Sequence, residues 1–287
     1  TDKKAKQKTR QWWNSYWKRS YVFIDSGKIG SDYWKVGRNY QLFRYMLGCN
    51  AYGSEPTKFN GGLFTFDPVH IDSTRVFTPD FRLWGGGTMT AQNQRLVYFP
   101  MLKSGDFDMM KPQFDFYERM LDNAKLRTKV YWNHGGACFS EQIENFGLPN
   151  LAEYDWKPRH EGFPVGVDSN PWLEYTWDTA LEFALMMFDA HLYNNEPIVP
   201  HLPFIESLLT FFDEHYSYLA LRRGTNKLDG DGHLVLYPGS ACETYKMATN
   251  ATSTVAALKV ITEKLLELPE LYATQREHWS GFLKRIP

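Results

Sequence analysis

The chain of 287 residues is poor in cysteine, and its charges nearly cancel. Its three cysteines, Cys49, Cys138 and Cys242, are too few and too scattered for a disulfide framework or a zinc site, so we expect buried thiols. Lys and Arg number 32 against 33 Asp and Glu, which gives a net charge of -1. Without an excess of positive charge, the chain is not expected to bind nucleic acid or an anionic lipid surface.

Long apolar runs and the motifs of several enzyme classes are also missing. The sequence holds no run of about 18 apolar residues, so no membrane span is expected, and no signal peptide is recognisable. It contains no HExxH, P-loop or GxSxG motif, which disfavours metal, nucleotide and serine-nucleophile chemistry. We therefore expect neither a metal nor a cofactor.

Aromatic residues, in contrast, are abundant. Trp, Tyr and Phe number 10, 17 and 20, or 16% of the chain, and this richness excludes a disordered protein. Apolar residues recur at spacings of three and four, which predicts an all-α chain of roughly eight helices in consecutive pairs. Asn170 followed by Pro171 predicts the start of one helix, because a capping side chain precedes a proline. Strands are expected only as short pieces in the long links between helices.

The links are unusually long for a compact domain. They include residues 52–87, 132–171 and a segment around the turn at 229–232, and links longer than about 15 residues are uncommon unless they are functional. If the helical hairpins form a ring, all these links share one rim, as in an (α/α) toroid that binds sugars. We therefore expect the polar and aromatic side chains of the links to converge on that rim.

Side chains suited to sugar binding are concentrated in the links and at the helix starts beside them. Aromatic rings stack on pyranose faces, and planar polar groups bind hydroxyls. The residues expected to bind substrate are Asn60, Trp84, Gln92, Arg95, His134, Glu141, Trp172, Glu174 and Tyr237. Other interpretations remain open: the tryptophans could belong to the core, His134 to a turn, and the glutamates to a solvated surface.

Glu243 has a distinctive context. It follows Pro238-Gly-Ser-Ala-Cys242, a segment of small and nearly uncharged residues. We expect Lys246 to point away from Glu243, so that the carboxyl faces an aromatic cleft and burial raises its pKa.

Several segments resemble, in order, the catalytic toroid of inverting α-L-fucosidases, glycoside hydrolase family ninety-five. They are Tyr40-Gln-Leu-Phe-Arg-Tyr-Met-Leu47, Glu55-Pro56, Phe59-Asn-Gly-Gly-Leu-Phe64, Asn93 with Tyr98-Phe-Pro100, and His233-Leu-Val-Leu-Tyr-Pro-Gly-Ser-Ala-Cys-Glu243. The resemblance is distant and covers most of the chain. It implies that residues 1–287 form a single catalytic domain, most of an (α/α)6 toroid, in a glycosidase-like bacterial relative of that family.

The resemblance also implies residue roles. Glu243 corresponds to the general acid, and Asn93 to one of two asparagines that position the attacking water. Ala91 stands where the other asparagine is expected. No counterpart is visible for the family's water-polarising Asp or for its N-terminal β-sandwich. We therefore expect the chain to be part of a longer protein with further domains, and the toroid to be truncated at its C-terminal end.

The function expected is hydrolysis of a plant, algal or host glycan with inversion, in which one carboxyl is the acid and a second is the base. The acid is Glu243, and the candidate bases are Asp178, Glu174 and Glu141. One alternative is a polysaccharide lyase that uses His134, Tyr237, Arg95 and Asn93. The other is a non-catalytic carbohydrate-binding toroid, which Ala91 favours. The partner expected is an oligo- or polysaccharide, and this substrate class implies a secreted or periplasmic protein.

Overall fold

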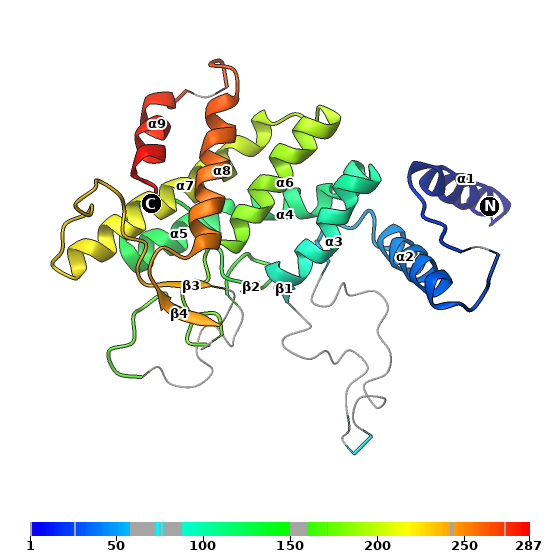
Figure 1. Ribbon diagram of the computed structural model, residues 1–287, viewed down its shortest axis with the longest axis horizontal. Helices are drawn as coiled ribbons and strands as arrows, with labels where there is room; N and C mark the ends of the chain where they lie inside the picture. The colour runs from blue at the N-terminus through cyan, green and yellow to red at the C-terminus, as the bar shows by residue number, and fades with distance from the viewer. Residues whose placement is uncertain are drawn as a thin grey trace.

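The computed structural model describes residues 2–25, 27–57, 73–74, 76, 88–149, 160–170, 172–241, 244–272 and 274–287. Helices dominate this part of the chain, which confirms the expected all-α class (Figure 1). They are α1 (Asp2–Arg19), α2 (Asp32–Cys49), α3 (Ala91–Ser104), α4 (Lys111–Arg119), α5 (Leu121–Trp132), α6 (Thr179–Asn194), α7 (Leu202–Arg222), α8 (Thr252–Glu267) and α9 (Arg276–Arg285). Short 3-10 turns, Phe107–Met109 and Val199–His201, precede α4 and α7.

Helix α6 is the centre of the packing. It lies between α3 and α8, and it also contacts α7. Its side chains are buried on nearly every side, including Leu181, Phe183, Met186 and Met187, so the helix is apolar all round rather than amphipathic. Helix α7 packs against α5, and α9 packs against α8. The helices that surround α6 thus fix the position of its first turn.

The α1–α2 hairpin lies at the side of this body (Figure 1). Its main polar link is the buried ion pair between Arg44 of α2 and Asp106, with Nη2 2.8 Å from Oδ2. Arg19 at the end of α1 binds Asp108 at 2.6 Å. Tyr16 donates a hydrogen bond to the Arg44 carbonyl at 2.6 Å, which joins the two helices of the hairpin. The segment that follows α3 therefore anchors the hairpin through two carboxylates.

Two antiparallel strand pairs occur in the described part of the chain. Strand β1 (Met89–Thr90) pairs with β2 (Gln142–Ile143), and β3 (Gly239–Ala241) pairs with β4 (Tyr245–Ala248). All four strands lie in the links, as the sequence predicted. β1 leads directly into α3, and the β3–β4 hairpin precedes α8, so both pairs lie where these helices begin (Figure 1).

Some local predictions are wrong. The helix expected after Asn170 begins only at Thr179, because the Asn170 side chain accepts the Trp172 N–H at 3.1 Å in a turn. Tyr175 then adopts the left-handed region, with φ of 61°, which is incompatible with a continuous helix. Glu174 and Asp178 therefore do not share a helix.

Other boundaries and one thiol also differ from expectation. The first helix ends at Arg19, whereas the apolar pattern continues to Ile24. The apolar spacing of residues 109–126 predicts one helix, but the structure divides this segment at Met120 into α4 and α5. Cys138 is buried as expected, but Cys49 is exposed at the end of α2. Cys242 lies outside the described residues.

Candidate functional site

The first turns of α3, α6 and α8 are joined by polar side chains. Arg95 of α3 donates to Glu182 of α6, with 2.6 Å between Nη1 and Oε1. Asp178, the residue before α6, accepts hydrogen bonds from Ser253 Oγ at 3.0 Å and Thr254 Oγ1 at 2.9 Å, both in α8. These five residues are called the polar rim below. They bring together segments that are more than 70 residues apart in the sequence.

The carboxyls of the polar rim have perturbed pKa values. Burial raises the pKa of Asp178, and the hydrogen bonds from Thr254 and Ser253 and the charge of Arg95 oppose this shift. Burial also raises the pKa of Glu182; Arg95 opposes the shift, and the nearby Asp178 adds to it. A carboxyl whose pKa is moved towards neutrality is suited to proton transfer, so the polar rim is a candidate for acid–base chemistry.

Glu141 caps helix α3 from a distant segment. Its carboxylate accepts the Gln92 N–H at 2.5 Å, and its backbone carbonyl accepts the Ala91 N–H at 2.8 Å. Thr90, the residue before α3, makes no capping bond with its own side chain. A buried carboxylate at a helix N-terminus satisfies free N–H groups and complements the helix dipole. Glu141 is 1% exposed. Its contacts indicate a structural role beside the polar rim.

Asn93 lies in the same first turn of α3 and is partly buried. Within the described residues its amide has no hydrogen-bond partner, so it is available to a ligand. The Gln92 N–H is bound by the Glu141 carboxylate, and Gln92 is partly buried. Gln92 and Asn93 thus lie in the turn of α3 that precedes Arg95.

His134 belongs to an aromatic cluster behind the rim. Its Nε2 lies 2.9 Å from Nδ1 of His215, a fully buried side chain of α7. The ring of His215 lies with its centroid 4.5 Å from that of Trp177, which directly precedes Asp178. Burial lowers the pKa of both histidines. The cluster therefore packs the segment that carries Asp178 against α7.

Aromatic side chains also surround the approach to α6. Trp172 is 62% exposed, and Lys246 Nζ of β4 lies 5.3 Å from its ring centroid, a cation–π contact. Burial raises the pKa of Tyr175, and the nearby Glu174 and Tyr237 add to the shift. The β3–β4 hairpin, Tyr237 and the segment before α6 are therefore neighbours. Whether Lys246 points away from Glu243 stays a prediction, because Glu243 lies outside the described residues.

The residues predicted from the sequence thus divide into three groups. At or beside the starts of α3 and α6 the structure places Gln92, Asn93, Arg95, Glu141, Trp172, Glu174, Tyr237 and Asp178. His134 lies behind them in the aromatic cluster. Asn60, Trp84 and Glu243 lie outside the described residues.

Sequence reasoning missed Glu182, Ser253, Thr254 and His215. The roles of Glu182, Ser253 and Thr254 depend on the packing of α3, α6 and α8, because each of these residues pairs with one that is remote in sequence. His215 had a local signal: it continues the buried stripe of Phe211 and Phe212 on α7. A histidine on an apolar stripe needs a polar partner, and His134 supplies it.

No family model matches this sequence, and no curated protein matches it. The resemblance to inverting fucosidases therefore rests on the sequence motifs alone.

Proposed function

We propose that the protein is an inverting glycoside hydrolase, and that its helices form part of an (α/α)6 toroid whose cleft lies at the polar rim. The observation that carries the proposal is the Asp178 carboxyl, oriented by two hydroxyls of α8 and raised in pKa by burial. Inverting hydrolysis requires such a carboxyl as a base, opposite a second carboxyl that protonates the leaving oxygen.

Among the candidate bases, the contacts favour Asp178. Glu141 is engaged as the cap of α3, so its carboxylate holds backbone N–H groups in place. Glu174 lies in an irregular turn before α6. Asp178 has fixed hydrogen-bond donors, and its raised pKa brings it closer to the pH at which a base accepts a proton efficiently. It would accept the proton of the water that attacks the anomeric carbon.

The proposed acid is Glu243. In the sequence it lies between β3 and β4, which pair with Ala241 opposite Tyr245. Lys246 of β4 contacts Trp172, at the beginning of the segment that leads to Asp178. The strands on either side of the acid are therefore close to the segment that carries the base. For inversion, the two carboxyls should lie about 6.5–9.5 Å apart, with the sugar and the water between them.

The contacts of the rim disfavour the lyase alternative. In a lyase, Arg95 or Asn93 would neutralise the uronate carboxylate, and the ion pair with Glu182 at 2.6 Å removes Arg95 from that role. The candidate bases of a lyase are His134 and Tyr237, and His134 is paired with His215 inside the aromatic cluster. The sugar would instead contact the exposed ring of Trp172 and the amide of Asn93. A secreted or periplasmic location and additional domains remain part of this proposal.

Two isosteric variants test the assignment. Glu243→Gln should reduce turnover of a natural glycoside by about 10²–10⁴-fold, because it cannot donate the acidic proton. A substrate with a good leaving group needs no protonation and should lose much less. Asp178→Asn should reduce turnover of both substrates, and azide, which attacks without a base, should restore part of it. Asp122→Asn, at an exposed position of α5, is the matched control and should keep most activity.

Three results would overturn the proposal. The first is wild-type turnover in Glu243→Gln or Asp178→Asn. The second is glycan binding without any hydrolysis by the wild-type protein, which would establish the non-catalytic alternative. The third is an unsaturated, ultraviolet-absorbing product, which would establish a lyase.

A further inference from the structure

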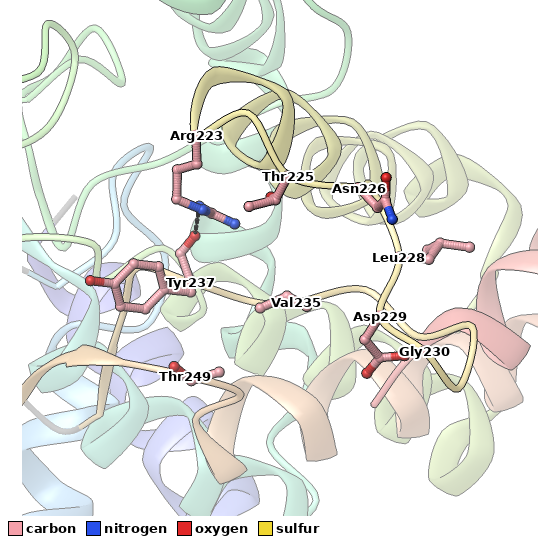
Figure 2. A pocket seen from close by; sticks show the side chains of 9 residues that line it. All are labelled: Arg223, Thr225, Asn226, Leu228, Asp229, Gly230, Val235, Tyr237 and Thr249. Atoms are coloured by element: carbon pink, nitrogen blue, oxygen red, sulfur yellow. Dashed lines mark hydrogen bonds between the residues drawn. The ribbon is translucent and has the colours of Figure 1, made fainter.

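A groove lies beyond Tyr237, between the end of α7 and the segment 228–237 (Figure 2). Its volume is about 550 Å³, within the range of small-molecule sites. Arg223, Thr225 and Asn226 form one side, and the segment from Leu228 to Tyr237 forms the other. Most of its lining residues are polar or glycine, and Leu228 and Val235 add an apolar part.

Arg223 is held in position without being neutralised. Its Nη1 donates to the Tyr237 carbonyl at 2.5 Å, and its guanidinium carbon lies 5.3 Å from the centroid of the Tyr237 ring. Within the described residues it has no carboxylate partner. Figure 2 shows the other end of the guanidinium directed into the groove. A fixed guanidinium with free N–H groups is a binding site for an anionic oxygen group.

Asp229, the second charged residue of the lining, does not form an ion pair with Arg223. Asp229 is turned towards its own loop, where Oδ1 accepts the N–H groups of Asp231 at 3.0 Å and His233 at 2.8 Å. These bonds lower the pKa of Asp229 and keep it ionised as a turn-stabilising group. The groove therefore presents the Arg223 cation at one end and the Asp229 carboxylate, bonded to its own loop, at the other, together with the neutral Asn226 and Thr225 (Figure 2).

Tyr237 connects the groove to the proposed cleft. Its carbonyl lies on the groove side, and its ring points away from the groove (Figure 2). Tyr175, which precedes Asp178, is near enough for Tyr237 to contribute to its raised pKa. Tyr237 therefore lies between the segment that leads to Asp178 and the groove, on a path that a glycan chain bound at the rim would follow.

We propose that this groove binds an acidic unit of the glycan, a sugar whose carboxylate or sulfate group is held by Arg223. The inference rests on the proposed function, and it specifies the substrate class as an acidic oligo- or polysaccharide. The cleaved bond lies at the polar rim, and the groove binds a charged sugar unit elsewhere in the same glycan chain.

The adjacent arginine provides a matched control. Arg222 has the same charge but donates to Tyr218 at 2.9 Å and does not line the groove. Binding of neutral, uronate-containing and sulfated oligosaccharides of equal length would be measured by calorimetry for the wild-type protein, Arg223→Gln, Arg223→Lys and Arg222→Gln. We expect Arg223→Gln to weaken binding of the acidic ligands about tenfold, the value of one charge-assisted hydrogen bond, and to leave the neutral ligand unchanged.

Arg223→Lys keeps the charge and should retain most of the acidic affinity, which separates lost recognition from a disturbed fold. Tighter binding of the uronate-containing or of the sulfated oligosaccharide identifies the group that Arg223 binds as a carboxylate or as a sulfate. The inference fails if the wild-type protein binds neutral and acidic ligands equally, or if Arg222→Gln and Arg223→Gln have equal effects.

Hydrolysis by the same proteins distinguishes the two proposals. Arg223-dependent binding of acidic ligands without hydrolysis supports the groove and refutes the glycosidase. Hydrolysis with identical kinetics in Arg223→Gln and wild type, on acidic and neutral substrates alike, supports the glycosidase and refutes the groove.

Discussion

The Asp178 carboxylate at the start of α6 accepts a hydrogen bond from Thr254 Oγ1 of α8 at 2.9 Å. This bond crosses between two neighbouring helices and ends on a carboxyl whose pKa is raised by burial. The hydroxyl stabilises the ionised form, while the surroundings disfavour it. The balance between these effects sets the pH at which Asp178 ionises.

Thr254→Val should shift that balance. The pKa of Asp178 rises when a donor to its ionised form is removed, so the acid-side inflection of kcat/KM should move to higher pH. The loss of one hydrogen bond to a buried carboxyl should also cost about 1–3 kcal/mol of stability. Thr252→Val, at the exposed first position of α8, is the control and should change neither quantity. An unchanged pH profile in Thr254→Val would contradict the role of Asp178 as base.

Asp178→Asn should stabilise the fold near neutral pH. The folded-state pKa of Asp178 is higher than its unfolded value, so ionisation costs free energy in the folded state. That cost is present above the folded pKa and absent below the unfolded pKa. The gain in melting temperature should therefore be largest near pH 7 and should vanish at about pH 3. A loss of stability at pH 7 would show that the hydroxyl bonds outweigh burial.

The histidine pair should make the fold sensitive to acid. Burial lowers the pKa of His134 and His215, so the folded state binds fewer protons than the unfolded state. Their contribution to stability is complete above the unfolded pKa of about 6.5 and is lost as the pH falls below it. His215→Phe should flatten this decline below about pH 6.5, whereas His160→Gln, at an exposed position, should leave it unchanged, as urea unfolding would show.

Glu141→Ala should destabilise the start of α3. The variant removes the acceptor of the Gln92 N–H and leaves helix N–H groups without a cap, at a cost of about 1–2 kcal/mol. Glu144→Ala, in the same link, should cost less than about 0.5 kcal/mol, because in the described residues its side chain caps no helix. Chemical denaturation measures both, and equal costs would contradict the capping role.

The sequence predicted the helices where apolar spacing is regular, as in α7 and α8, because burial of one helix face depends on local pattern. It failed at Asn170, where a local helix-start signal is overridden by the left-handed Tyr175 and by the burial of Trp177 against α7. Residue type alone made Arg95 and Asp178 candidates for the site. It could not identify Glu182 or Thr254 as their partners, because helix packing alone brings them together.

The cap of α3 is another contact between remote segments that the sequence does not predict. Glu141 was expected to bind substrate, but it lies 49 residues from the N–H group that it satisfies. A capping residue adjacent to its helix can be predicted from a sequence, whereas one supplied by a distant segment cannot.

The anomeric configuration of the first sugar released is the most direct test of the account. Proton NMR would follow wild-type hydrolysis of an acidic oligosaccharide from its first minutes, before mutarotation mixes the anomers. The account predicts that the product appears with the configuration opposite to that of the substrate, because one water attacks under the action of Asp178 while Glu243 protonates the leaving oxygen. Retention of configuration would contradict it, since retention requires a covalent intermediate on a carboxylate nucleophile.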